Sequence, residues 1–224
     1  MDQNEMKIAA ARAALAEVRD GMRLGLGTGS TAAEFVKLLA GRDVRCTCTS
    51  ENTDRLARSL GIPTFPLAEL APLDLAVDGA DAIDGQLRLI KGGGGALLRE
   101  KIVEQAAKRF IVIADETKVM ATLSGQTLPV EVTPFAREVL EQRFADLHPV
   151  LRLRDGQPRV TDEGHLILDV RVPEDRDIAE VVARIRESAG VVDTGFFPTE
   201  ATEAIIATSS GVRRMRRAGV PPAG

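Results

Sequence analysis

Residues 73–114 read LDLAVDGADAIDGQLRLIKGGGGALLREKIVEQAAKRFIVIA, with an apolar segment at each end of a polar, glycine-rich middle. The pattern predicts strands at Leu73–Val77 and Phe110–Ala114 and a helix at Ala96–Lys108. Strands that alternate with helices favour a parallel sheet covered by those helices. Each residue of the glycine run Gly92–Gly95 weakens regular structure, so we expect a loop whose backbone approaches something closely or adopts positive φ.

The chain before residue 73 shows the same alternation. Its predicted elements are helix 4–19, strand Met22–Gly27, helix Thr31–Ala40, strand Val44–Thr49 and helix Asn52–Leu60. The fold class we predict is α/β, with a Rossmann-like, open and mainly parallel sheet that carries helices on both faces.

The pattern changes after Gly125. The predicted elements are strand Val130–Thr133, helix Pro134–Leu147, strands Val150–Arg154, Val160–Thr161 and His165–Val172, helix Asp177–Ala189 and strand Val191–Phe197. This β-α-β-β-α-β order predicts a small ferredoxin-like α+β domain. Strand Ala204–Thr208 is expected to return to the first sheet. We therefore expect one domain from residues 1–126 with 203–224, and a second from residues 127–202.

Composition narrows the class of protein. With 224 residues, of which 44% are hydrophobic, the chain can bury a full core. Its net charge of −4 argues against a large nucleic-acid surface. No apolar run approaches the roughly 18 residues of a membrane span, and the charged N-terminal segment is typical of an amphipathic helix, not of a secretion signal. We expect a cytoplasmic protein without a nucleic-acid or membrane partner.

An arginine cluster near the C-terminus has two interpretations. It consists of Arg213, Arg214, Arg216 and Arg217. The side chains would contact a phosphate or a partner, or they would belong to a frayed, solvated terminus. Chain ends are commonly poorly ordered, so we expect the frayed terminus.

Cysteine and histidine side chains offer no clear site. Cys46 and Cys48 lie in one predicted strand and on one face, too close in sequence for a relaxed disulfide. We interpret both as packing residues instead of half a metal site. His148 and His165 adjoin turn residues, and we assign neither a role.

Polar segments follow three predicted strands at their carboxyl ends. They are Thr28–Thr31, Asp78–Asp81 and Asp115–Lys118. Because ligands of open parallel sheets bind outside the carboxyl ends of the strands, we expect these segments to meet at one site.

The first of these segments lies in GLGTGST, residues 25–31, which opens a helix. Backbone N–H groups and the helix dipole favour a phosphate there. The segment lacks the lysine of a Walker A loop, and Ser30 replaces the third glycine of the dinucleotide fingerprint. A plain tight turn between strand and helix is the alternative.

The carboxylates Asp78 and Asp81 fit a metal site, an acid/base pair, or a turn with a helix cap. Lys91 favours a catalytic interpretation, because a nearby cation keeps a carboxylate ionised and stabilises an oxyanion. Asp84 is predicted to form a hairpin turn without a catalytic role. Glu100 is our candidate base, although a glutamate in a first helical turn also favours the dipole.

In combination, these segments strongly resemble the ribose-5-phosphate isomerase family of the A type. The resemblance covers nearly the whole chain: Lys7, GTGSTA at 27–32, DGAD at 78–81, KGGGGALLREK at 91–101, ADETK at 114–118 and LPVEV at 128–132. It implies interconversion of ribose 5-phosphate and ribulose 5-phosphate in the non-oxidative pentose phosphate pathway. It also implies no metal and no cofactor, and assembly as a homodimer or homotetramer.

The resemblance also implies roles for individual residues. Glu100 would be the catalytic base that forms a cis-enediolate, while Asp81 and Asp78 would move protons between oxygens and Lys91 would stabilise the enediolate. The substrate would be contacted by Lys7, Thr28, Gly29, Ser30, Thr31, Asp78, Gly79, Ala80, Asp81, Lys91, Gly92, Gly93, Gly94 and Lys118. The family's pattern differs from this chain at Ala82, Gly95 and Leu98, which puts local packing in question but removes no proposed catalytic group.

Other functions fit less well. A sugar-phosphate-sensing regulator would normally carry a DNA-binding module, for which the acidic chain has no obvious surface. The incomplete glycine fingerprint argues against a nucleotide-binding oxidoreductase. A related sugar-phosphate isomerase or deaminase explains the KGGGG…REK segment less well.

Overall fold

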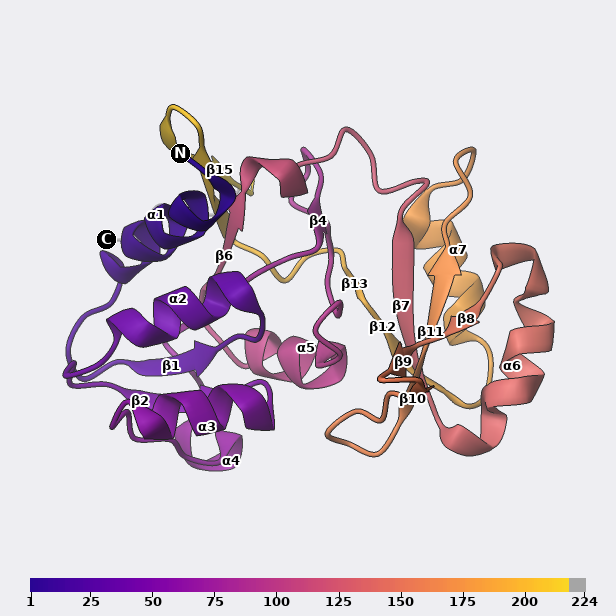
Figure 1. Ribbon diagram of the computed structural model, residues 1–224, viewed down its shortest axis with the longest axis horizontal. Helices are drawn as coiled ribbons and strands as arrows, with labels where there is room; N and C mark the ends of the chain where they lie inside the picture. The colour runs from indigo at the N-terminus through magenta and orange to yellow at the C-terminus, as the bar shows by residue number, and fades with distance from the viewer. Residues whose placement is uncertain (218–224) are drawn as a thin grey trace.

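A six-stranded sheet forms the centre of the larger lobe (Figure 1). The computed structural model describes residues 1–217. The strands are β1 (Arg23–Leu26), β2 (Arg45–Cys48), β3 (Leu75–Asp78), β6 (Phe110–Asp115), β14 (Glu203–Thr208) and β15 (Gly211–Arg216). Their order is β15-β14-β6-β3-β1-β2, and all neighbours are parallel except β14 and β15. The predicted α/β fold with a mainly parallel sheet is confirmed.

Helices cover both faces of this sheet, as predicted. They are α1 (Gln3–Leu15), α2 (Ser30–Leu38), α3 (Glu51–Ser59), α4 (Leu67–Leu70) and α5 (Leu97–Gln105). The first three share a core with Ile111 and Ile113 of β6. On the opposite face, Val103 of α5 packs beside Gly25 and Ala76, and α4 packs against Val103. Among residues 1–217, no helix is both long enough and apolar enough to cross a membrane.

A second, three-stranded sheet packs on the same face of the main sheet as α5. Its strands are β4 (Ala82–Ile83), β5 (Leu89–Ile90) and β13 (Phe196–Phe197), in the order β13-β5-β4 with antiparallel neighbours. The turn between β4 and β5 confirms the predicted hairpin, because the Asp84 side chain accepts hydrogen bonds from the N–H groups of Gln86 and Arg88.

The smaller lobe contains a four-stranded antiparallel sheet (Figure 1). The strands are β7 (Thr127–Val132), β8 (Val150–Leu151), β11 (Leu166–Arg171) and β12 (Val191–Thr194), and the helices are η2 (Pro134–Ala136), α6 (Arg137–Arg143), η3 (Ala145–Leu147) and α7 (Ile178–Arg186). The order β12-β7-β11-β8 follows the expected ferredoxin-like pattern. Alternate apolar residues of β7 and β11 form one core with α6 and α7. The residue boundaries of the two domains stay a prediction.

Three predicted elements of this lobe differ in the structure. No strand forms at Val160–Thr161, because the Thr161 backbone instead closes a turn with Gly164 and His165. The predicted strand Val150–Arg154 is divided into β8, which pairs with β11, and β9 (Leu153–Arg154), which forms a short hairpin with β10 (Gln157–Pro158). The predicted helix Pro134–Leu147 is divided into η2, α6 and η3.

The arginine cluster at residues 213–217 is not a frayed terminus, so this expectation is wrong. β15 pairs with β14 along its full length. The Arg214 guanidinium forms ion pairs with Glu17 (2.8 Å) and Glu203 (2.6 Å). Arg217 donates to the backbone carbonyls of Ala201 and Leu87. Carboxylates and carbonyls already present on the main lobe therefore order this segment, while residues 218–224 lie outside the described part of the chain.

The predicted strand Val191–Phe197 is interrupted at Gly195, where the chain passes from one sheet to another. β12 pairs with β7 of the small lobe, whereas β13 pairs with β5. At the crossing, the Gly195 N–H donates to Pro129 and its carbonyl accepts from the Lys91 N–H. A Cβ atom on Gly195 would lie 2.1 Å from the Lys91 carbonyl oxygen. Only glycine permits this close approach.

The substitution Gly195→Ala is therefore expected to lower the free energy of unfolding by about 1–3 kcal/mol, the usual cost of overpacking. Urea denaturation measures this change. Gly85→Ala is the matched control, since a Cβ atom there has nothing within 4 Å, and its effect should stay within about 0.5 kcal/mol. Equal stability of both variants would contradict the close-approach argument.

Candidate active site

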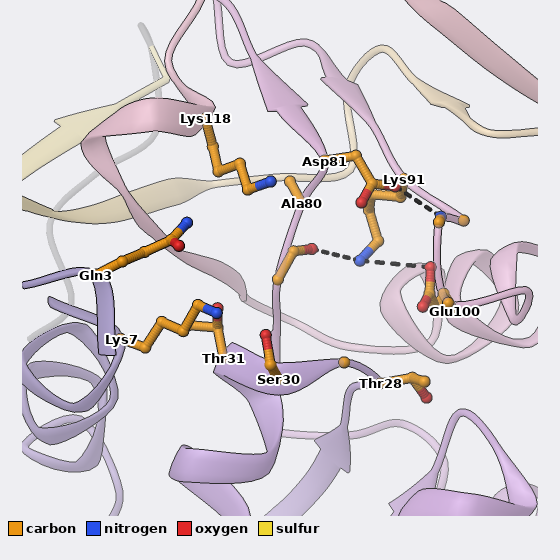
Figure 2. Close-up of a pocket in the computed structure, with 15 residues that line it drawn as sticks. Gln3, Lys7, Thr28, Ser30, Thr31, Ala80, Asp81, Lys91, Glu100 and Lys118 are labelled. Atoms are coloured by element: carbon orange, nitrogen blue, oxygen red, sulfur yellow. Dashed lines mark hydrogen bonds and ion pairs between the residues drawn. The ribbon is translucent and has the colours of Figure 1, made fainter. Parts of the chain in front are cut away.

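One pocket lies where the carboxyl ends of β1, β3 and β6 converge (Figure 2). Its lining residues are Gln3, Lys7, Thr28, Gly29, Ser30, Thr31, Gly79, Ala80, Asp81, Lys91, Gly92, Gly93, Gly94, Glu100 and Lys118. These include every candidate residue from the sequence except Asp78, which is buried directly behind the pocket wall. The expected convergence of the three polar segments is therefore observed.

The loop after β1 is fixed to the carboxylate behind it. Asp78 accepts hydrogen bonds from the N–H groups of Thr28 (3.0 Å) and Gly79 (2.6 Å). A Cβ atom at Gly27 would lie 2.0 Å from the Asp78 side chain, so glycine is needed here. α2 then begins at Ser30 without a side-chain cap. The helix N-terminus is thus available to an anion.

Cationic side chains from two other elements reach the same end of the pocket. Lys7 comes from α1 and Lys118 from η1 (Glu116–Lys118); Figure 2 shows Lys7 beside Thr31 and Lys118 extending toward Ala80. Gln3, which the sequence analysis did not single out, also lines this end and donates to Asp115 at 3.4 Å. These groups suit the binding of a phosphate.

The opposite end of the pocket contains a buried lysine surrounded by carboxylates. The Lys91 Nζ atom donates to the Gly79 carbonyl at 2.6 Å. It lies 2.9 Å from Asp78, 3.2 Å from Glu104 and 3.5 Å from Glu100. All four side chains are at most 3% exposed. Such a cluster is typical of catalytic sites.

Burial shifts the ionisation of these groups. Burial raises the pKa of Glu100 to about 8; the Lys91 ammonium opposes this shift, and the charges of Asp78 and Asp81 add to it. Burial likewise raises the pKa of Glu104 well above its usual range. For Lys91, burial lowers the pKa, but the three neighbouring carboxylates outweigh it and hold the pKa well above the ordinary value. Lys91 therefore stays a cation, whereas Glu100 changes its protonation near neutral pH.

The glycine run forms a loop at the Lys91 end of the pocket, with the positive φ and the close backbone approach that its sequence predicted. Gly92 has φ +102°, which favours glycine. The Gly93 N–H donates to Asp81 at 2.7 Å, and a Cβ atom on Gly93 would lie 2.6 Å from an Asp81 oxygen. From the small lobe, Arg152 donates to the carbonyls of Gly92 and Gly93, and Arg159 to that of Gly94.

Sequence reasoning missed Glu104 and the two arginines. Glu104 lies in an ordinary helical run, and only its spacing of four residues from Glu100 places the two on one face. Arg152 and Arg159 lie more than fifty residues from the glycines in sequence, so no local pattern connects them. The sequence signal that could have pointed to Glu104 is thus its i, i+4 relation to Glu100.

Other side chains that could bind a metal ion are buried or bonded to other residues. Among residues 1–217, no three His, Cys, Asp or Glu side chains form a group suited to a metal ion. Cys46 and Cys48 are free thiols, and burial raises the pKa of both to about 12, consistent with packing residues. The His165 ring lies 3.0 Å from the buried carboxylate of Glu131, a contact that its predicted surface turn did not suggest.

The chain is similar in sequence and in structure to proteins of one known family. Residues 45–211 match the family model described as ribose 5-phosphate isomerase A (phosphoriboisomerase A). The ribose-5-phosphate isomerase A of Sinorhizobium medicae is 48% identical over 96% of this chain and 99% of its own length, and that of Agrobacterium fabrum is 50% identical over the same shares. The solved structure of ribose 5-phosphate isomerase A from Methanocaldococcus jannaschii superimposes with a TM-score of 0.88 at 36% identity, covering 95% of this chain and 98% of that one. A D-ribose-5-phosphate isomerase in complex with phospho-erythronic acid superimposes with a TM-score of 0.90 at 36% identity, covering 97% and 100%. The chain belongs to the ribose 5-phosphate isomerase A family, whose members are aldose–ketose isomerases that interconvert ribose 5-phosphate and ribulose 5-phosphate.

Proposed function

We propose that this chain interconverts ribose 5-phosphate and ribulose 5-phosphate through a cis-enediolate, with Glu100 as the base. The observation that carries the proposal is the buried Lys91 cluster, which borders the same pocket as the Thr28–Thr31 loop. A carboxylate and a cation at one end, and an anion-binding loop at the other, match a sugar phosphate with a reactive carbonyl.

The proton transfer follows from the position of Glu100. An aldose–ketose isomerisation moves a proton between C2 and C1, and one carboxylate within reach of both carbons removes and returns it. Negative charge develops on the carbonyl oxygen as the proton leaves. The Lys91 ammonium and the N–H groups of the glycine loop stabilise that charge at the buried end of the pocket. Asp81, which lines the pocket, moves protons between the sugar oxygens and assists ring opening, whereas Asp78, behind the pocket wall, holds the Thr28 loop and Lys91 in place.

The phosphate holds the other end of the substrate. Its contacts are the α2 N-terminus at Ser30 and Thr31, together with Lys7 and Lys118. This remote binding energy orients C1 and C2 toward Glu100. The scheme requires neither a metal nor a redox cofactor.

Family membership supports three further proposals. We place the enzyme in the cytoplasm and in the non-oxidative pentose phosphate pathway. We also propose that it assembles as a homodimer or homotetramer.

Glu100→Gln should lower kcat by about 10²- to 10⁴-fold, because the amide cannot accept the substrate proton. The measurement is conversion of ribose 5-phosphate by purified protein in EDTA, without added cofactor. The parent protein should turn over under these conditions, and the variant should still bind the sugar phosphate. An active variant would remove Glu100 as the base, and an inactive parent that binds the substrate would favour the sugar-phosphate sensor.

The pH dependence of kcat/KM should show an acid limb with an apparent pKa of about 8. Glu100 must be ionised to act as a base, and burial raises its pKa, so the rate constant should fall roughly tenfold per pH unit well below that value. Rates between pH 7 and 9.5 test this, because the substrate phosphate, with a second pKa near 6, stays dianionic there. A flat profile over this range would contradict the expected ionisation.

Lys118→Ala should act mainly on substrate binding and raise KM by about 10- to 100-fold, the value of a lost hydrogen bond to a charged group. Steady-state kinetics separate this from a loss of kcat. Lys37→Ala is the matched control, since that lysine is paired with Glu34 on the exposed side of α2. An unchanged KM in the Lys118 variant would remove this lysine from the phosphate site.

A further inference from the structure

The buried Lys91 ammonium has more acceptors than it has donors. Four groups lie around its Nζ atom: the Gly79 carbonyl at 2.6 Å, Asp78 at 2.9 Å, Glu104 at 3.2 Å and Glu100 at 3.5 Å. A lysine ammonium has three N–H donors. The Gly79 carbonyl accepts one of them, so the carboxylates of Asp78, Glu104 and Glu100 compete for the other two, and Asp78 is the nearest of the three.

Glu104 lies closer to the Lys91 Nζ atom than Glu100 does, and it has no role in the isomerisation as proposed so far. Its side chain is 1% exposed, and neither carboxyl oxygen has a hydrogen-bond partner among the described residues apart from its ion pair with Lys91. Burying a carboxyl group in this way is costly unless a partner compensates. The group lies one helical turn after Glu100 on α5, so both side chains approach Lys91 from the same face.

We propose that Glu104 is a positioning residue for the isomerisation: its carboxyl oxygen accepts the third donor of Lys91 and leaves Glu100 free to take the substrate proton. The inference rests on the proposed role of Glu100 as the base. Without Glu104, Lys91 would turn its third donor to Glu100. A carboxylate that is fully paired with a buried ammonium is a weaker base.

Charged groups from every neighbouring element agree with this assignment. Asp78 on β3 and Asp81 in the following loop face Glu100, and Asp78 also faces Glu104. Lys101 of α5 points away, to Asp193 of β12 at 3.0 Å and to the Thr194 carbonyl. Glu131 of β7 is held by Thr161 and His165. Lys91 is thus the cation that Glu100 and Glu104 share.

The two aromatic rings beside Lys91 do not supply an acceptor for the third donor. Its Nζ atom lies 5.7 Å from the centre of the Phe110 ring and 5.5 Å from that of Phe197. Aromatic faces attract an ammonium but do not replace a hydrogen-bond acceptor. Burial raises the pKa of Glu104, and the Lys91 ammonium opposes this shift. Both effects agree with a poorly solvated carboxyl group whose main partner is Lys91.

The test compares the pH profiles of kcat/KM for the parent, Glu104→Met and Glu104→Gln, between pH 7 and 9.5. In Glu104→Met the acceptor is lost, and the acid limb should move to lower pH by about one unit, as expected when an opposite charge pairs more closely with a carboxylate. KM for ribose 5-phosphate should stay within about twofold, because the phosphate end is untouched. Glu104→Gln keeps an acceptor oxygen and should restore the limb most of the way to that of the parent.

Control variants separate the proposal from a structural role. Val103→Ala removes a buried side chain of the same helix that packs toward Leu70 and Leu73; it should lower stability without moving the limb. Glu104→Leu repeats the loss of the acceptor with a second apolar shape, should Glu104→Met not fold.

Two results would overturn the proposal. One is an acid limb in Glu104→Met or Glu104→Leu that stays in place or moves to higher pH. The other is an equal shift in Glu104→Gln, which would show that the donor count is not what matters. An active Glu100→Gln variant would show that Glu100 is not the base. This result is separate from the test of Glu104, because Glu104 is unchanged in that variant.

Discussion

The burial of the Lys91 ammonium is the constraint on which the rest of the structure depends. Its side chain joins the loop after β3, through Asp78 and Gly79, to helix α5, through Glu100 and Glu104. Its backbone N–H donates to Gly195 at the crossing between the two lobes. Removing one partner from a buried ionic group leaves an uncompensated charge, which is strongly destabilising. The cation to which we assign the stabilisation of the enediolate therefore also connects three parts of the fold.

Helix α5 can carry buried carboxylates because it lies between two sheets. Val103 packs toward the main sheet beside Gly25, while Lys101 reaches β12 in the four-stranded sheet of the smaller lobe. Ile102 and Gln105 take the water-facing side of this helix, whereas Glu100 and Glu104 lie on its buried side and lose their hydration. Desolvation makes a carboxylate more basic, and a general base benefits from this when its pKa approaches the working pH.

The sequence predicted the site better than it predicted the contacts that support it. The rule that ligands bind at the carboxyl ends of parallel strands brought together Thr28–Thr31, Asp78–Asp81 and Lys118, because that rule needs only the strand ends. Glu104 was missed because a glutamate in a helical run is ordinarily solvated, whereas α5 lies between the main sheet and the sheet of the smaller lobe, which buries Glu104. For the same reason Gly195 read as part of one continuous strand, and the C-terminal arginines read as a solvated end. Each of these depends on contacts between segments far apart in the chain.

The three lysines of the pocket differ in their exposure to water, and this difference suits them to different tasks. Lys7 and Lys118 are partly exposed, which suits them to a strongly hydrated phosphate. The phosphate takes no part in the proton transfer, so it has only to be bound. Lys91 is 2% exposed, and in that low-dielectric setting a charge acts more strongly on a developing oxyanion. An arginine would not serve there, since its planar guanidinium cannot direct three donors to acceptors arranged around one nitrogen. The compact ammonium that we propose to stabilise the enediolate is also shared among three carboxylates, and under our proposal the sharing of its donors sets how basic Glu100 can be.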